Sequence, residues 1–316
     1  MIYILIIILL LFAAELLYFR IADHFNIIDK PNERSSHTSV TLRGGGILFW
    51  VGVLFYFLMS GWHYPWFFAG LTLVAAISFA DDVKLQSPIV RLVLQFIGLL
   101  LMSIQWQLFD FSWIIVVLVI VVSVGVLNAF NFMDGINGIT GGYSLAVLAS
   151  LWYVNNYVTA FVDNNLIYLV FLALLVFNFF NFRIKAKCFA GDVGAVSIAF
   201  ILIFILGMLI IKTGDLSYIA FLLVYGVDSV LTIVHRILLK ENITEPHRMH
   251  LYQLLSNELK VPQLLVSTIY AVLQLLISFG FIMFYSVSLW YLVIVAVLLT
   301  VVYLIIKRKY FHLHRS

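Results

Sequence analysis

Residues 194–211 read GAVSIAFILIFILGMLII, and no charged side chain interrupts this run. A helix needs about 20 apolar residues to cross the hydrocarbon core of a bilayer. Because lipid offers the backbone no hydrogen-bond partners, such a run must satisfy its own amides within a helix. Asp192 precedes the run and Lys212 follows it. The stretch therefore predicts a membrane-spanning helix with a charged residue near each end.

The whole chain has the composition of a membrane protein. Of its 316 residues, 64% are hydrophobic and 10% are charged, whereas a soluble domain has about 25% charged residues. So few polar side chains cannot cover a water-facing surface, which excludes a soluble globule and a disordered chain. The apolar residues form long runs instead of alternating, which argues against an outer-membrane barrel. We predict an all-α, polytopic helical membrane protein.

Apolar runs of the required length predict about eleven transmembrane spans. A signal peptide has basic residues before its apolar run, and the first run of this chain has none. We therefore expect this run to be retained as a span. The predicted spans are residues 1–19, 44–61, 64–80, 90–106, 111–130, 139–156, 165–182, 194–211, 216–235, 262–284 and 287–306.

Basic residues divide the connections between these spans into two sets. One set carries every Lys and Arg except Lys212. Because basic loops stay on the cytoplasmic side, we expect the N-terminus outside and the C-terminus in the cytoplasm. We expect one integral membrane domain, 1–316, with an active site built from the cytoplasmic loops. These loops are 20–43, 81–91, 128–140, 183–193 and 235–261, and the tail after 306 lies on the same side.

The inner loops also hold most of the acidic residues and histidines, which is typical of an interfacial enzyme. The alternative is a transporter or lipid flippase without chemistry, which would place ionisable groups near the middle of the bilayer. Only Glu15 and Asp228 are candidates for such a position. The formal net charge of +3 indicates no nucleic-acid partner. The single cysteine, Cys188, excludes an intrachain disulfide and a cysteine-only metal cluster.

Asp81 and Asp82 close the third predicted span, and Lys84 and Arg91 follow them. A charged residue inside hydrocarbon costs about 2.5–3.5 kcal/mol, so two adjacent acids at a span end indicate a metal-phosphate site. Neighbouring side chains on a helix differ by about 100° in direction. The two carboxylates therefore cannot both point at one ion, and we expect different roles for them. The alternative is that they cap the next helix.

Residues 128–142, NAFNFMDGINGITGG, place a polar side chain at every third position from Asn128 to Asn137. The glycines allow a ligand or a neighbouring helix to approach closely. One side of this helix end would then present amides and the Asp134 carboxylate to a ligand. The alternative is a packing segment held by polar contacts.

Asp192 lies in a Gly-Asp-Val-Gly sequence, 191–194, after the basic residues Arg183, Lys185 and Lys187. A carboxylate between glycines suits Mg²⁺ that holds a diphosphate, because Mg²⁺ takes one or two carboxylates and leaves other positions to water and phosphate. The alternative is a turn acid at a helix start. Three glycines, 44–46, follow Arg43 and could form an anion-binding nest or a tight helix contact.

The longest inner loop, 235–261, contains PHRMHLYQ at residues 246–253. A loop rich in His and Arg can bind phosphates or donate a proton. It lacks the ligand spacing of a zinc site. The alternative is a solvated linker.

In their order along the chain, these motifs resemble the polyprenyl-phosphate N-acetylhexosaminyl-1-phosphate transferase family, glycosyltransferase family 4. This family includes the phospho-MurNAc-pentapeptide translocase. The resemblance implies transfer of a HexNAc 1-phosphate from a UDP-sugar to undecaprenyl phosphate, with release of UMP, at the inner face of the bacterial plasma membrane. The motifs are PNERSSH (31–37), RGGG (43–46), the aspartate pair (81–82), NAFNFMDGINGI (128–139), FAGDVG (189–194) and PHRMH (246–250).

By position, the resemblance also implies roles for individual residues. Asp192 matches the ligand of a catalytic Mg²⁺, for which Mn²⁺ is the alternative. The expected catalytic residues are Asp81, Asp82 and His250. The expected substrate-binding residues are Asn131, Asp134, Asn181, Arg91 and Arg248. The implied partners are the UDP-HexNAc, undecaprenyl phosphate and the bilayer, and both a monomer and a homodimer remain open.

Two residues depart from the family pattern. Asn137 stands where many members have Asp, and Tyr252 stands where a second histidine would follow His250. The translocase branch carries three consecutive histidines at this place. The sequence is therefore more similar to the branch that starts surface polysaccharides such as the O-antigen of lipopolysaccharide.

Overall fold

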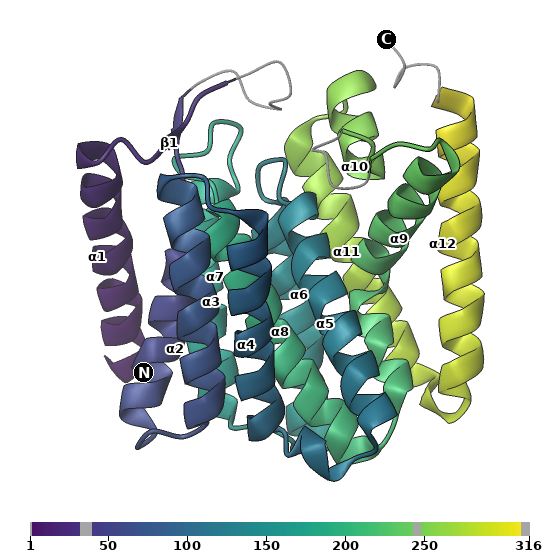
Figure 1. Ribbon diagram of the computed structural model, residues 1–316, viewed down its shortest axis with the longest axis horizontal. Helices are drawn as coiled ribbons and strands as arrows, with labels where there is room; N and C mark the ends of the chain where they lie inside the picture. Colours follow the sequence, from purple (N-terminus) through teal and green to yellow (C-terminus); the bar gives the residue numbers. More distant parts are fainter. Residues whose placement is uncertain (1, 32–39, 243–247, 311–316) are drawn as a thin grey trace.

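The computed structural model describes residues 2–31, 40–242 and 248–310. Long helices follow one another through these residues and lie side by side (Figure 1). They are α1 (Ile2–His24), α2 (Ile47–Met59), α3 (Pro65–Val83), α4 (Pro88–Gln105), α5 (Trp113–Met133), α6 (Ile139–Tyr157), α7 (Asn164–Asn181), α8 (Gly191–Thr213), α9 (Leu223–Leu238), α11 (Gln263–Met283) and α12 (Ser288–Tyr310). The short elements are β1 (Ile28–Asp29), β2 (Thr41–Leu42), α10 (Leu251–Gln253), the π-turn η3 (Leu254–Glu258) and the 3₁₀ turns η1 (Leu108–Asp110), η2 (Leu216–Leu222) and η4 (Tyr285–Val287).

The prediction of an all-α, polytopic membrane protein is confirmed. A helix lies at each of the eleven predicted positions. Within the described residues, 9 helical segments are long and apolar enough to cross a membrane, and η2 with α9 forms one of them. Of the other two, α2 is apolar but has only 13 residues, and α6 carries several polar residues along its length. The orientation of these helices in a membrane stays a prediction.

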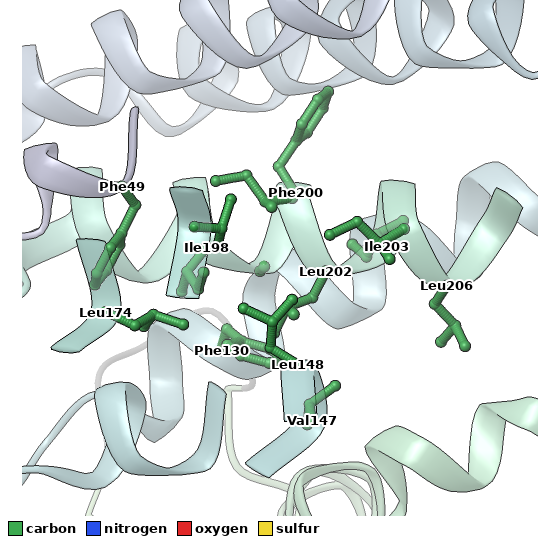
Figure 2. Packing of buried hydrophobic residues seen from close by; sticks show 14 of the residues in the cluster. Phe49, Phe130, Val147, Leu148, Leu174, Ile198, Phe200, Leu202, Ile203 and Leu206 are labelled. Atoms are coloured by element: carbon green, nitrogen blue, oxygen red, sulfur yellow. The ribbon is translucent and has the colours of Figure 1, made fainter. Parts of the chain in front are cut away.

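The core is built around α8, the helix predicted from residues 194–211. It is apolar on all sides, so it must be surrounded by other helices to be buried. It packs against α3, α5, α2 and α6. Figure 2 shows how its side chains meet those of its neighbours. The labelled residues of α8 are Ile198, Phe200, Leu202, Ile203 and Leu206, and those around them are Phe49 from α2, Leu174 from α7, Phe130 from α5, and Val147 and Leu148 from α6.

The three glycines before α2 make a close helix contact. A β-carbon on Gly46 would lie 2.2 Å from the Cα atom of Gly194 in the first turn of α8. The amides of Gly45 and Gly46 donate to the carbonyls of Phe189 and Ala190. Of the two interpretations of these glycines, the tight packing contact is therefore the one that the structure contains.

The predicted inner-face motifs gather at one end of the helices. Figure 1 shows β1 and α10 at the same end as the last turns of α3 and α5 and the first turn of α8. Leu42 of β2 also forms an isolated bridge with Cys188. This end therefore collects segments from loops that are far apart in the sequence, and we call it the site face.

Thiol labelling can test the orientation, but not through the native cysteine. Cys188 is fully buried, and burial raises the pKa of its thiol well above the usual range, so it would resist a label on either side. Ile184 on the site face is 88% exposed and Leu216 at the opposite end is 66% exposed.

In a Cys188→Ala background, we expect Leu216→Cys to react with a membrane-impermeant thiol reagent in intact cells. Ile184→Cys should react only after the membrane is opened, because the basic loops stay inside. Labelling is scored by the mass shift of the purified protein. The reverse pattern would place the site face outside and refute the orientation.

Candidate functional site

Asp82 ties the end of α3 to the start of α8. Its carboxylate accepts hydrogen bonds from the amides of Asp192 and Val193, each at 2.9 Å. The first amides of a helix have no partner inside the helix, and the helix dipole favours a negative charge there. Arg43 Nε also lies 2.6 Å from Asp82 Oδ1. Asp82 therefore caps α8 and fixes the backbone that carries Asp192.

Asp81 makes different contacts from its neighbour. Its Oδ1 atom accepts from the amide of Gln86 at 2.6 Å, and its Oδ2 atom lies 2.7 Å from Arg91 Nη1. The first contact holds the turn that leads into α4, but Gln86 lies before that helix begins, so Asp81 does not cap it. Asp82 caps α8, which is not the next helix along the chain. The two acids point to different partners, as their neighbouring positions on a helix predict.

Asp192 completes a cluster of three acids and two arginines. Its Oδ1 atom lies 3.0 Å from Arg43 Nη2, and its Oδ2 atom lies 3.3 Å from Arg91 Nη1. The Asp192 side chain is 16% exposed, compared with 3% for Asp81 and 0% for Asp82. Asp192 is thus the acid that a ligand at the site face would reach. We call these five residues the Asp–Arg cluster.

Arg43 was not among the predicted site residues, although it bridges Asp82 and Asp192. Burial lowers the pKa of Arg43, but the charges of Asp82 and Asp192 outweigh this effect and raise it, so the guanidinium stays charged. Every basic residue of an inner loop is already explained by the membrane orientation. The sequence signal that set Arg43 apart from the other basic residues was its place in the RGGG motif, 43–46.

The carboxylates of the cluster could bind a hard cation such as Mg²⁺ only if a bound substrate and water supply its other ligands. Across the described residues, no three His, Cys, Asp or Glu side chains are arranged to hold a metal ion. Mg²⁺ needs only one or two carboxylates when phosphate oxygens and water complete its shell. The two Asp192 oxygens lie 3.0 Å and 3.3 Å from a guanidinium nitrogen. Asp192 therefore suits a metal that arrives with a diphosphate, and the predicted role as metal ligand stays a prediction.

Asp134 lies directly after α5, beside this cluster. Burial raises the pKa of Asp134 to about 6, although a hydrogen bond from Thr140 lowers it, and the charge of Asp82 raises it further. The Thr140 hydroxyl donates to Asp134 Oδ1 at 2.6 Å. Asn131, one turn earlier, makes no side-chain hydrogen bond to any residue that the structure describes. Both predicted substrate contacts stay predictions.

Two asparagines connect this segment to the loop before α8. Asn181 accepts from the amide of Gly138 and donates to the carbonyl of Cys188, each at 2.8 Å. Asn137 donates to the carbonyls of Arg183 and Ile184. The Asn181 amide therefore positions the backbone on both sides of the site. The contact between Asn181 and a substrate stays a prediction.

His250 is buried against Asp228 of α9. Its Nδ1 atom lies 3.3 Å from Asp228 Oδ1, which also accepts from the amide of Leu251 at 2.9 Å. The Tyr270 hydroxyl donates to Asp228 Oδ2 at 2.7 Å. A carboxyl in an apolar span needs such hydrogen-bond donors. The position of Asp228 within an apolar span was therefore the sequence feature from which a contact with the histidine loop could have been predicted.

The solvated-linker alternative is wrong for residues 250–258, which fold into α10 and η3. His247, in the same motif, and most of the PNERSSH motif (32–37) lie outside the described residues. Arg248 is described and is half-buried. The predicted roles of Arg248 in substrate binding and of His250 in catalysis stay predictions.

Tyr252, the departure from the family pattern, joins the histidine loop to the segment after α5. Its hydroxyl donates to the carbonyl of Phe132 at 2.9 Å. A β-carbon on Gly135 would lie 2.2 Å from this hydroxyl oxygen, so only glycine leaves room for it. The rings of Tyr252 and His250 stack with centroids 5.8 Å apart. In the described part of the chain, no hydrogen bond or ion pair links His250 to the Asp–Arg cluster.

Comparison with known proteins shows what the chain is similar to. Residues 64–211 match the model of a family described as glycosyl transferase family 4. This range contains the aspartate pair, the Asn-rich segment and the Gly-Asp-Val-Gly sequence, but not the histidine loop. The family match therefore confirms the resemblance and covers three of its six motifs.

Individual relatives agree with the family match. The chain is 26% identical over 254 residues to a probable undecaprenyl-phosphate N-acetylglucosaminyl 1-phosphate transferase of Bacillus subtilis, which covers 74% of this chain and 70% of the relative. It is 30% identical over 224 residues to the undecaprenyl-phosphate alpha-N-acetylglucosaminyl 1-phosphate transferase of Escherichia coli K12, which covers 62% of this chain and 59% of the relative. It is 31% identical over 126 residues to a phospho-N-acetylmuramoyl-pentapeptide-transferase of Halalkalibacterium halodurans, which covers 36% of this chain and 38% of the relative.

The raised pKa of Asp134 predicts a pH-dependent stability. Because the pKa rises from 3.8 to about 6 on folding, the folded state binds the proton more tightly than the unfolded state. This stabilisation is present below the ordinary pKa and is lost as the pH rises through the folded value. A shift of about two pKa units corresponds to about 3 kcal/mol.

We therefore expect Asp134→Asn, which keeps an acceptor for Thr140, to gain stability relative to wild type at about pH 8 but not at about pH 4. The measurement is the thermal midpoint of the purified protein in detergent at both pH values. The control is Asp110→Asn, a change at an exposed acid just before the opposite end of α5. An equal difference between variant and wild type at both pH values would contradict the assignment.

Proposed function

We propose that this chain is a membrane glycosyltransferase of the family 4 type. It would transfer an N-acetylhexosamine 1-phosphate from a UDP-sugar to undecaprenyl phosphate, with release of UMP. The observation that carries the proposal is the Asp–Arg cluster, which collects three acids and two arginines at the site face. The names of the relatives given above support undecaprenyl phosphate as the acceptor.

A site at the ends of membrane helices suits these two substrates. The acceptor phosphate is attached to a lipid and stays at the membrane surface, while a UDP-sugar is dissolved in the cytosol. Both can meet only at such a face. The cluster offers guanidinium groups, which bind phosphate oxygens in a fork geometry. Arg43 and Arg91 are each about one-third exposed, so they can exchange a carboxylate partner for a phosphate oxygen.

We propose that the acids of the cluster divide the work. Asp192 would hold a Mg²⁺ ion, which neutralises the diphosphate and stabilises the departing UMP. Asp82 is committed to the amides of α8 and acts by keeping Asp192 in place. Asp81 would orient the lipid phosphate and accept its proton.

The acceptor phosphate would attack the donor directly. A lipid phosphate oxygen forms a bond to the sugar-linked phosphorus, and the bond from this phosphorus to the bridging oxygen of UMP breaks. The products are a lipid-linked diphosphate sugar and UMP. Such phosphoryl transfer depends mainly on positioning and charge stabilisation, which are what the cluster offers. We propose that the product starts a surface polysaccharide on the inner membrane of a bacterium.

The alternative is a transporter or flippase without chemistry. It would use an ionisable group near the middle of the bilayer. Asp228 was one of the two candidates, and its carboxylate already accepts hydrogen bonds from Leu251 and Tyr270. This commitment argues against a transport role for Asp228. Glu15, the other candidate, is buried in α1, and its Oε1 atom accepts from the Cys188 thiol at 3.5 Å.

The proposal is tested with membranes that contain the protein, undecaprenyl phosphate and a panel of UDP-HexNAc donors, beginning with UDP-GlcNAc. We expect UMP release that needs both substrates and Mg²⁺. Asp192→Asn should lower the rate by about a thousandfold, because a metal ion stabilises the transition state by several kcal/mol and 1.36 kcal/mol is about tenfold in rate.

Asp110→Asn, an exposed acid outside the cluster, serves as the matched control and should leave the rate unchanged. An absence of UMP with every donor would contradict the transferase and favour the transporter. A normal rate and an unchanged Mg²⁺ titration in Asp192→Asn would contradict the metal assignment alone.

Substitutions of the two adjacent acids, Asp81 and Asp82, should differ in their effect on the thermal stability of the protein. Asp82→Asn leaves an amide group facing the helix donors and Arg43, and hydrogen bonds to a charged group are worth about 1.5–3 kcal/mol each. We therefore expect Asp82→Asn to lower both turnover and the thermal midpoint. Asp81→Asn should lower turnover with a smaller change in midpoint. Equal losses of stability in both variants would contradict the division of roles.

A further inference from the structure

The last helix, α12, buries only two side chains among those that the structure describes, Tyr303 and Lys307. They lie four residues apart and therefore on one face of the helix. The rest of α12 is apolar and largely exposed, as expected for a helix that faces lipid. Apolar residues would suffice to pack a membrane helix, so two polar side chains at its buried seam require a specific explanation.

Lys307 contacts the histidine loop directly. Its ammonium group donates to the carbonyl of Met249, the residue before His250. Lysine near a helix end usually extends its charge into water, and the neighbouring Arg308 and Lys309 are exposed. Lys307 is only 3% exposed. Its ammonium is therefore turned inward, against the backbone of this loop.

Tyr303 reaches the same loop through a chain of hydrogen bonds. The Thr232 hydroxyl donates to Asp228 Oδ1 at 3.2 Å and lies 2.9 Å from the Tyr303 hydroxyl. Because Thr232 has one hydrogen to give, Tyr303 donates to Thr232. Asp228 in turn holds His250 Nδ1 and the Leu251 amide.

These contacts also determine the tautomer of His250. An ionised carboxylate can only accept hydrogen bonds, so the Nδ1 atom that faces Asp228 carries a hydrogen. In the neutral ring, Nε2 is then the basic atom. Phe132 and Tyr252 lie close to the ring, with centroids at 6.3 Å and 5.8 Å. The ring is thus held in one orientation, with Nδ1 toward Asp228.

We infer that α12 serves the transfer site, with Lys307 and Tyr303 acting as positioning residues for His250 through Met249 and Asp228. The inference rests on the proposed function in that His250 takes part in the reaction. Lys307 acts on the backbone before His250, and Tyr303 acts on the carboxylate that binds its ring. Together they fix the histidine loop against α9 from the lipid-facing side.

The test compares Lys307→Met and Tyr303→Phe with Lys309→Met, which removes an exposed charge from the same turn. Hydrogen exchange of the 249–254 peptide, followed by mass spectrometry of the full-length protein, reports the position of the loop without any substrate. We expect exchange at the Leu251 amide to become about tenfold faster in Lys307→Met and Tyr303→Phe, because a lost buried hydrogen bond to a charged or backbone partner is worth about this factor. Lys309→Met should match the wild type.

Turnover provides the second readout. We expect a lower kcat in Lys307→Met with little change in the KM for the UDP-sugar. In a His250→Ala background, Lys307→Met should cause no further loss, because both changes remove the same contribution. Independent, multiplying losses would show a general structural role and overturn the inference.

The outcomes separate this inference from the proposed function. If no donor yields UMP but loop exchange accelerates in Lys307→Met and Tyr303→Phe and not in Lys309→Met, the positioning contact stands and the transferase proposal fails. If the wild type releases UMP and loop exchange and kcat are unchanged in both α12 variants, the inference is wrong. If Lys307→Met does not fold, Tyr303→Phe, which keeps the aromatic ring, decides by the same two measurements.

Discussion

The capping of α8 by Asp82 is the contact on which the site face depends. One buried carboxylate accepts from the amides of Asp192 and Val193 in the first turn of the central helix and faces Arg43. These amides have no hydrogen-bond partner inside the helix, and the helix dipole also attracts a negative charge to this end. A single interaction therefore closes the core at its polar end and sets the position of Asp192. The close Gly46–Gly194 contact allows the segment that carries Arg43 to approach.

Ion pairs hold the Asp–Arg cluster together, although its three acids outnumber its two arginines. Three carboxylates so close together would repel each other, and two guanidinium groups separate them. Each guanidinium bridges Asp192 to one member of the aspartate pair. A diphosphate with a divalent cation would replace part of these contacts with contacts of the same kind.

The histidine loop follows the same principle at a second position. Asp228 lies within an apolar span, where a lone carboxylate would be costly. It is offset by donors from Leu251, Thr232 and Tyr270. These donors come from different helices and from the loop. The hydrogen bonds that stabilise the buried Asp228 carboxylate therefore also hold His250 in a defined position. The seam of α12 extends this network to the lipid-facing side of the protein.

The sequence alone determined the helical architecture and the grouping of motifs at one face, because hydrocarbon permits only self-satisfied backbone and basic loops mark one side. The resemblance of its motifs to a transferase family also indicated Asp81, Asp82 and Asp192 as residues of one site. Only the tertiary structure decided how these residues divide their contacts. Arg43 as the bridge, Asp228 as the partner of His250 and Lys307 as a buried contact depend on distances between helices remote in the sequence. Residue type and spacing cannot encode such distances, because packing in three dimensions sets them.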